Sequence, residues 1–321
     1  MFFFFQKRKK TFLGANKQLK DIEINLNRNF LGKFRNISLR YALITNRGTK
    51  ILRARAHKLQ DTPEREWKVL NFLRKFNLAR NLAKPVDYFS PLNIFFYEEA
   101  PGICGEKLLA ERKIKPLLGV TPELAQVFKK IHSIKYKKNL LPIKDNGEDL
   151  KERRHWYFLV RKCCPELYSA FSQLLKTLWQ FRCKNEIIFK RPLALTHQDF
   201  HWGNVIISER GPVKIIDFSY TCYSDPFEDV GGFIAQTESM FRYYAPQFMA
   251  EKEKIIKIFL ENYFQRAITP ADKKALFYFI IRKNLEIAAV LSFVISDKKA
   301  KVAGVKNHLA AAEREIKFLN F

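Results

Sequence analysis

The stretch between residues 193 and 218 constrains the fold of this chain more than any other part. Two short apolar runs, at residues 205–207 and 213–216, are separated by Arg210-Gly211-Pro212, which is typical of a tight connection between two strands. Three polar residues flank these runs, namely Asp199, Asn204 and Asp217. We therefore expect a small hairpin that carries two carboxylates and one amide close to its ends.

The N-terminal third combines strand patterns with one helical pattern. Residues 38–57 place two β-prone runs around Asn46-Arg47-Gly48, which predicts a second hairpin. Pro63 then opens a segment with apolar residues at helical intervals. Residues 86–89 and 94–97 have the composition of two further strands. These patterns predict a small sheet with one helix.

Helical spacing dominates beyond Pro101-Gly102. It is seen at residues 122–132, at 150–181 with a break at Pro165, and again from about 227 onward. The most apolar of these stretches, 275–295, contains Arg282, Lys283, Asn284 and Glu286. These polar residues predict a buried helix rather than a membrane span. With 321 residues, the chain exceeds what one core of roughly 250–300 residues holds comfortably, so two lobes fit best.

The three polar residues of the hairpin region match the needs of metal-assisted phosphoryl transfer. Asp199 would orient and deprotonate a substrate hydroxyl, and Asn204 and Asp217 would supply oxygen ligands to magnesium. His197 would hold the loop backbone by hydrogen bonds, and Gly203 would let the loop turn tightly. The alternative is that these Asp and Asn residues merely cap turns, as isolated ones usually do. Their joint spacing favours the catalytic interpretation.

The segment His197-Gln-Asp-Phe-His-Trp-Gly-Asn204, followed by Ile216-Asp-Phe218, resembles the aminoglycoside phosphotransferase and choline kinase family. The usual pattern of that family is His-Gly-Asp-x-His-x-x-Asn, followed by Ile-Asp-Phe or Ile-Asp-Trp. In this chain Gln198 stands where the family pattern has glycine. The resemblance implies a protein-kinase-like, two-lobed α+β fold with ATP and Mg2+ as cofactors. It also implies that backbone groups from Glu98 to Ala100 hydrogen-bond adenine, and that the helix ending at His132 supports the catalytic loop.

We expect the chain to divide into three segments, with the main boundary where the strand patterns end before Pro101-Gly102. Residues 1–28 would be a basic N-terminal tail or an extra helix. Residues 29–100 would be a nucleotide-binding N-lobe with a small antiparallel sheet. Residues 101–321 would be a larger, mostly helical C-lobe that carries the catalytic and substrate-binding residues.

Two departures from the family pattern affect the nucleotide site. The usual phosphate-binding lysine of the third strand corresponds to Arg53, which would pair with Glu66 on the following helix. Lys50 and Arg55 are alternatives, and Arg53 is preferred to Lys50 because it shares a strand face with Arg55. The loop expected to cover the phosphates contains Gly32 but no Gly-x-Gly-x-x-Gly.

Composition sets weaker limits on the partners of this protein. Its formal net charge of +26 should attract polyanions, including nucleotide, nucleic acid and an anionic membrane surface, although no nucleic-acid motif accompanies it. Five cysteines without paired spacing indicate a reducing, cytoplasmic location. The apolar Met1-Phe-Phe-Phe-Phe5 precedes Lys7-Arg-Lys-Lys10, the reverse of a signal peptide. It could be a frayed tail or a membrane-surface foot.

The acceptor stays open at this stage, and so does the oligomeric state. A sugar, an amino alcohol, an aminoglycoside or a phosphorylated metabolite would each fit. A polycation would need carboxylates such as Glu148, Asp149 and Glu152, whereas a quaternary amine would need an aromatic cage, for which Trp156, Tyr157, Phe233 and Tyr243 are available. Two other functions remain, a nucleotide-binding protein without turnover and a kinase for a nucleic-acid-linked or otherwise polyanionic substrate.

Overall fold

The computed structural model describes residues 18–28, 34–45, 48–57, 62–137, 140–144 and 146–319. The chain divides into two compact units. The first unit consists of the described residues up to Gly102 together with the later segment Lys214–Tyr220. The second unit consists of Ile103–Val213 and the residues from Thr221 onward. The division predicted at residue 100 therefore differs in one segment, because Lys214–Tyr220 packs with the first unit.

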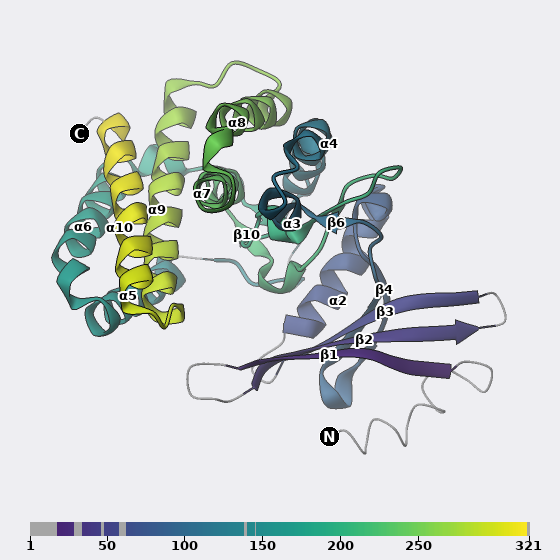
Figure 1. Cartoon of the computed structure of the whole chain (residues 1–321). Coiled ribbons are helices and arrows are strands. Elements are labelled where there is room, and N and C mark those ends of the chain that lie inside the picture. Colours follow the sequence, from purple (N-terminus) through teal and green to yellow (C-terminus); the bar gives the residue numbers. More distant parts are fainter. Residues whose placement is uncertain are drawn as a thin grey trace. The chain divides into compact units, whose positions relative to one another are not determined.

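The first unit is built on an antiparallel sheet with strand order β1-β2-β3-β5-β4 (Figure 1). Its strands are β1 (Gln18–Arg28), β2 (Phe34–Thr45), β3 (Gly48–His57), β4 (Lys84–Phe89) and β5 (Ile94–Glu98). Strands β2 and β3 confirm the hairpin predicted at residues 38–57, and β4 and β5 confirm the two strands predicted after the helix.

Strand β1 replaces the tail or helix expected before residue 28. Its sequence alternates between polar and apolar residues, with Asp21, Glu23, Asn25 and Asn27 interleaved with Ile22, Ile24 and Leu26. This period of two is the mark of a strand, and it outweighs the basic residues that precede the segment in the sequence. The Phe-rich residues 1–17 lie outside the described residues.

Helix α2 (Thr62–Leu73) covers one face of this sheet. On the other face Leu52 and Ala54 of β3 form a core with Tyr41, Ile94 and Phe96. Side chains alternate along a strand, so Arg53 and Arg55 point to the α2 face. Arg55 lies opposite Phe95 in the β3–β5 ladder, and the Phe95 ring is 6.0 Å from that of Trp67 in α2.

The second unit is mainly helical. Its helices are α3 (Gly105–Ala110), α4 (Ile114–His132), α5 (Asn146–Cys163), α6 (Tyr168–Lys184), α7 (Phe227–Tyr244), α8 (Met249–Phe264), α9 (Pro270–Val294) and α10 (Lys298–Ile316). The predicted break at Pro165 separates α5 from α6. The predicted α+β class, with a small antiparallel sheet unit and a larger helical unit, is confirmed.

Helix α4 begins eight residues before the predicted start at Pro122. A proline inside a helix removes one backbone hydrogen bond, which favours placing it at the first turn. Here the buried side chains of Leu117, Thr121 and Leu124 continue one apolar face through the proline. This tertiary packing compensates for the lost bond.

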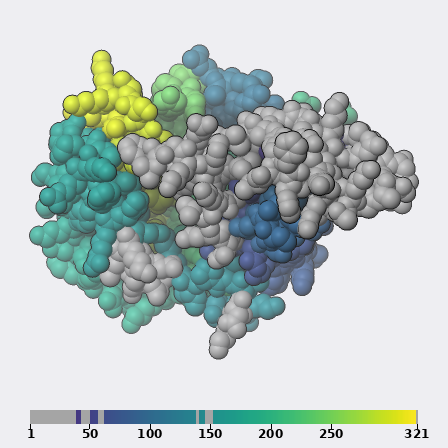
Figure 2. Space-filling view, turned by 90° about the horizontal axis from the view of Figure 1, so that it is seen from below, coloured from purple at the N-terminus to yellow at the C-terminus, as the bar shows by residue number. Residues whose placement is uncertain are grey.

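Helix α9 is the buried apolar helix predicted around residues 275–295. It begins with a capping box in which Thr269 and Asp272 exchange hydrogen bonds, and Pro270 occupies its first turn. Figure 1 shows α9 between α7 and α10. At Gly231 of α7 a Cβ atom would lie 2.7 Å from Cβ of Phe279, so α7 and α9 pack too closely there for a side chain. In Figure 2 the yellow α10 lies against the teal segment that includes α6.

Short strands complete the second unit. Strand β7 (Ala194–Thr196) pairs with β10 (Cys222–Ser224), and β6 (Ile103–Cys104) pairs with β8 (Val205–Ile207). Strand β9 (Lys214–Ile215) belongs to the first unit, where Ile215 bridges to Leu82. The five cysteines are free thiols. No helix among the described residues is long and apolar enough to cross a membrane.

Stability should fall in mild acid because of His308 in α10. Burial lowers the pKa of His308 to about 4, so between pH 6.5 and 4 the unfolded chain binds a proton that the folded chain does not. The unfolding free energy therefore decreases as the pH falls through this window, by up to roughly 3 kcal/mol. Urea unfolding at pH 7 and 4.5 should show the wild type losing about 2–3 kcal/mol more than His308→Gln. The exposed-site variant His155→Gln should follow the wild type, and parallel curves for all three proteins would contradict this assignment.

Candidate functional site

The second unit holds Asp199 and Asn204 together in one loop. This loop follows β7 and ends in the 3-10 turn Trp202–Asn204, directly before β8. The Asn204 amide nitrogen donates to the Asp199 carbonyl oxygen at 2.8 Å and approaches Asp199 Oδ2 at 3.4 Å. Because Nδ2 is directed at Asp199, the Oδ1 atom of Asn204 is the amide atom that can serve as a metal ligand.

Asp199 is an ionised carboxylate at neutral pH. Burial alone would raise the pKa of Asp199, but the nearby His201, with the charges of Lys283 and His197, holds that pKa well below its usual range. His201 Nε2 lies 3.6 Å from Asp199 Oδ2, and one third of the Asp199 side chain is exposed. The group can therefore accept a hydrogen bond from a hydroxyl that reaches it.

Aromatic stacking fixes the backbone of this loop next to Asp199. The Phe200 ring stacks on Phe128 of α4 with a centroid distance of 3.5 Å, and on Phe233 of α7 at 4.6 Å. Trp202 is fully buried, and its indole N–H donates to Thr237. Two residues that closely follow Asp199 are thus part of the hydrophobic core.

Asp229 holds the start of the loop. Its carboxylate accepts hydrogen bonds from the backbone N–H groups of His197 (2.6 Å) and Gln198 (2.8 Å), and it is 3.0 Å from His132 Nε2. His132 is the predicted structural histidine, and its other ring nitrogen bonds to Tyr263. The fully buried His197 ring packs against Phe128 and Phe200. Asp229 thus holds the backbone at His197, and the loop-holding hydrogen bonds expected from the His197 side chain stay a prediction.

Gln198 has a left-handed backbone conformation, with φ of 70°. This explains why glycine is usual at this position of the motif, since a left-handed residue other than glycine costs roughly 1–2 kcal/mol. The Gln198 side chain offsets this cost by three hydrogen bonds. It accepts from Lys144 Nζ at 3.0 Å and donates to Thr196 and Ser224 at 2.8 and 2.9 Å.

The first unit gathers Glu66 and Asp217 around Arg55. Both guanidinium ends of Arg55 bond to the Asp217 carboxylate, with Nη2 to Oδ2 at 2.9 Å, and Nη1 lies 3.5 Å from Glu66. Ser219 donates to Asp217, and the Phe218 N–H donates to Glu66 at 3.2 Å.

Burial dominates the electrostatics of this cluster. It raises the pKa of Glu66 to about 7, although the Arg55 charge opposes the rise. Burial by itself would lower the pKa of Arg55, but Glu66 and Asp217 raise it well above its usual value. Arg55 is therefore a permanent cation fixed between two carboxylates.

The predicted pair of Arg53 with Glu66 is wrong, because Arg55 takes that place. Arg53 instead donates a hydrogen bond from Nε to the Glu99 carboxylate at 2.8 Å. The same carboxylate also accepts a hydrogen bond from Arg40. Both arginines point to the same face of β3, so alternation cannot separate them. The distinction comes from position along the strand, since Arg53 lies opposite Tyr97, next to the chain at Glu98 and Glu99.

The remaining predicted nucleotide-site residues are only partly described. Glu98 side-chain oxygen accepts from Lys50 and Lys84, each at 2.9 Å, so Lys50 is engaged at the end of the sheet. The Glu99 N–H donates to the Ile51 carbonyl. Adenine binding by the backbone of Glu98 to Ala100 stays a prediction. Gly32 lies outside the described residues.

The sequence interpretation overlooked three contributors to these clusters. Asp229 lies about thirty residues beyond the loop in the sequence, so no local pattern indicates its contact with the loop backbone. Lys283 is far away in α9 and yet acts on Asp199. Ser219 was the easiest to find, because a hydroxyl two residues after Asp217 can reach back to that carboxylate.

Comparison with protein families identifies a match over most of the chain. The family model of the Phosphotransferase enzyme family matches residues 35–257. The comparison with curated proteins finds no match.

Solved structures share the fold at low sequence identity. An ethanolamine kinase from Plasmodium vivax is 16% identical over 90% of this chain and 81% of its own, with a TM-score of 0.61. The ADP-bound aminoglycoside phosphotransferase APH(2'')-Ib is 15% identical over 99% and 98% of the two chains, also with a TM-score of 0.61. The choline kinase LicA from Streptococcus pneumoniae is 12% identical over 98% of both chains, with a TM-score of 0.61.

Two substitutions at Gln198 should separate backbone strain from side-chain bonding. Gln198→Ala loses the three side-chain hydrogen bonds and keeps the left-handed strain, whereas Gln198→Gly loses the same bonds and relieves the strain. The glycine variant should be the more stable of the two by about 1 kcal/mol. Both should be less stable than the wild type, because each lost bond costs about 1 kcal/mol, and the bond from the charged Lys144 costs more.

Urea unfolding of the three proteins measures these differences. An alanine variant as stable as the glycine variant would show that the strain at residue 198 contributes nothing.

Proposed function

Because this chain belongs to the phosphotransferase enzyme family, we propose that it transfers the γ-phosphate of ATP to a hydroxyl group of a small molecule. Asp199 is the catalytic base, and Asn204 and Asp217 hold Mg2+. The observation that carries the proposal is the loop in which an ionised Asp199 orients the Asn204 amide while Asp229 and Phe200 fix the backbone. The ADP-bound neighbour named above supports nucleotide binding.

The chemistry of Asp199 follows from its low pKa. As a carboxylate it accepts a hydrogen bond from the acceptor hydroxyl and aims that oxygen at the γ-phosphorus. A weak base of this kind removes the proton late, as the new P–O bond forms, so most of its contribution is orientation. His201 and Lys283 stabilise the ionised form before the proton moves.

The donor set suits magnesium. Asn204 offers a neutral amide oxygen and Asp217 an anionic carboxylate, and Mg2+ prefers oxygen ligands while keeping several waters and phosphate oxygens in its shell. Bound Mg2+ would neutralise charge on the transferring phosphates. Among the described residues no group of three or more His, Cys, Asp or Glu side chains forms a metal cluster.

Arg55 is our candidate for the phosphate-binding cation. Its guanidinium contacts Glu66 through Nη1 and donates hydrogen bonds from Nη1 and Nη2 to the two carboxylate oxygens of Asp217. A nucleotide phosphate is a stronger partner for this planar fork than a second carboxylate, so phosphate binding would draw Arg55 toward the nucleotide and free oxygens of Asp217. The free thiols of the chain suit a reducing compartment, and a cytoplasmic location stays our prediction.

Phosphorylation of a metabolite pool with labelled ATP and Mg2+ tests the reaction. Asp199→Asn should lower kcat by roughly 10²–10⁴-fold and still be protected by ATP against thermal unfolding. Asp217→Asn should lose the magnesium-dependent part of that protection. Glu209→Gln, an exposed carboxylate in the turn after β8, is the matched control and should behave like the wild type.

The outcomes separate the alternatives. Protection by ATP without product in any pool would indicate a nucleotide-binding protein without turnover. Absence of both ATP protection and product would overturn the proposal.

The two arginines of β3 provide a second test. Arg55→Gln should weaken ATP binding at least tenfold, because a charge-assisted bond to phosphate contributes about 1.5–3 kcal/mol. Arg53→Gln removes the same charge two residues away on the same face and should change the ATP Kd by less than threefold. Calorimetric titration with ATP and Mg2+ measures both, with thermal melting as the check of folding. Equal effects of the two substitutions would contradict the assignment of Arg55.

A further inference from the structure

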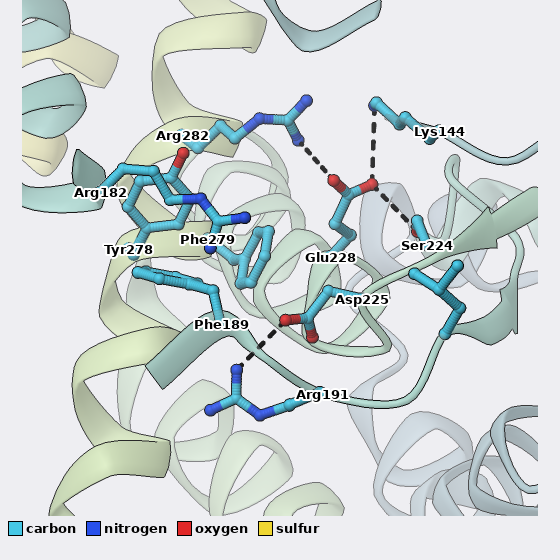
Figure 3. Close-up of a pocket in the computed structure, with 11 residues that line it drawn as sticks. Lys144, Arg182, Phe189, Arg191, Ser224, Asp225, Glu228, Tyr278, Phe279 and Arg282 are labelled. Atoms are coloured by element: carbon cyan, nitrogen blue, oxygen red, sulfur yellow. Dashed lines mark hydrogen bonds and ion pairs between the residues drawn. The ribbon is translucent and has the colours of Figure 1, made fainter. Parts of the chain in front are cut away.

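A cation-lined pocket lies in the second unit beside the catalytic loop. It has a volume of about 100 Å³, whereas one buried water needs roughly 10–15 Å³, so it can take a group of several heavy atoms. Four cationic side chains from separate segments line it, Lys144, Arg182, Arg191 and Arg282 (Figure 3). Its acidic lining residues are Asp225 and Glu228.

Both carboxylates of the pocket are already neutralised by its own cations. Glu228 lies 3.5 Å from Lys144 and 3.5 Å from Arg282, and it accepts from Ser224 Oγ at 3.3 Å. Although burial would raise it, the pKa of Glu228 falls to about 2 because of Lys144 and Arg282. Asp225 accepts from Arg191 at 3.1 Å. The acidic residues therefore offer little to a cationic ligand.

Arg182 differs from the other three cations. Among the side chains that the structure describes, no carboxylate lies within ion-pair distance of it, and its buried Nη1 atom has no hydrogen-bond partner. The guanidinium lies 3.9 Å above the Phe189 ring, which holds it by a cation–π contact, and 5.9 Å from Tyr278. A buried guanidinium nitrogen without an acceptor costs free energy, so an acceptor oxygen supplied by a ligand would stabilise Arg182.

Gln198 links the pocket to the catalytic base. Its carbonyl oxygen accepts from Lys144 at 3.0 Å and its amide nitrogen donates to Ser224 at 2.9 Å, and both partners line the pocket. Gln198 is the residue directly before Asp199. The pocket is therefore connected through one side chain to the residue that precedes Asp199.

The residues suggested for a cationic acceptor do not gather in this way. Glu152 forms ion pairs with Arg282 at 2.8 Å and with Lys144 at 3.1 Å. Of the possible aromatic cage, Trp156 and Phe233 are buried in the core, and Tyr243 is 80% exposed. The side chains of Glu148 and Asp149 lie outside the described residues.

We propose that this pocket binds an oxyanion of the phosphate acceptor, a carboxylate or a phosphate group, through Arg182. The acceptor is then a small hydroxylated anion rather than an amino alcohol or a polyamine. The identification of the ligand as the phosphate acceptor rests on the proposed function. Anion binding in the pocket can be tested without it. Carboxylate and phosphate both match the planar fork of a guanidinium.

Direct binding decides whether the site exists. Isothermal titration with inorganic phosphate, acetate and choline chloride, at constant ionic strength and without nucleotide, compares the wild type with Arg182→Gln. Phosphate or acetate should bind the wild type, and Arg182→Gln should weaken the tighter of the two at least tenfold, while choline should not bind. Arg182→Lys, which keeps the charge, should fall between them and guards against a folding defect, which thermal melting monitors in each variant.

Two control variants exclude other sources of the signal. Lys184→Gln removes the same unit of charge from the end of α6 outside the pocket, and it should bind phosphate within twofold of the wild type. Arg55→Gln removes the cation of the nucleotide site and should leave the Arg182-dependent binding in place. Equal binding of phosphate and acetate to the wild type and Arg182→Gln, or preference for choline, would overturn the proposal.

The acceptor assay separates this inference from the proposed function. Pools of hydroxy acids, sugar phosphates and amino alcohols are offered with labelled ATP. Phosphorylation confined to the anionic pools, with a KM at least tenfold higher in Arg182→Gln and an unchanged KM for ATP, supports both. Phosphorylation of amino alcohols that is insensitive to Arg182→Gln supports the kinase and overturns the anion pocket. If no pool is phosphorylated, the proposed function fails, and the titration alone decides the pocket.

Discussion

The loop from His197 to Asn204 depends on hydrogen bonds to the buried carboxylate of Asp229. Asp229 is 1% exposed, and it accepts from two consecutive backbone N–H groups at the point where the chain leaves β7, as well as from His132. Such charge-assisted bonds are roughly twice as strong as neutral ones. Asp229 is also in the first turn of α7, where the helix dipole favours a negative charge. One side chain thus joins α4, α7 and the loop, and the left-handed turn at Gln198 persists because this anchor fixes it.

Local pattern was enough to predict most of the fold and the core of the site. Alternation and turn residues located β2, β3, β4 and β5, and the five-residue spacing from Asp199 to Asn204 placed their side chains in contact. Pattern failed where a stronger long-range contact decided the outcome. Pro122 sits inside α4 because the buried face extends through it. The strand at 18–28 has a plain alternation of polar and apolar residues. The basic residues 7–10 before it favour a tail or a helix instead, and this composition is the weaker of the two signals.

The exchange of Arg53 for Arg55 shows a limit of reasoning from one strand. Side-chain alternation assigns both arginines to the face that α2 covers, and composition makes them equal. Only the pairing of β3 with β5 and the packing of α2 decide which of them meets Glu66. Asp217 depends on the same packing, because the turn Phe218–Tyr220 lies against α2 and Ile215 bridges to Leu82. The sequence offers two equivalent arginines for the candidate site, and tertiary contacts decide which of them meets Glu66.

Charge placement explains why the net charge of +26 says little about partners. Arg282 and Lys283 are consecutive residues of α9, so their side chains diverge by about 100° around the helix. One reaches Glu228 and Glu152 beside the pocket. The other pairs with Glu286 and acts on Asp199. A buried cation is retained only where opposite charge compensates its desolvation, and both of these cations meet that condition. The same criterion sets Arg182 apart, because its described surroundings are aromatic rather than acidic. The expected chemistry of the ligand therefore follows from the unbalanced charge of Arg182 and not from the net charge of the protein.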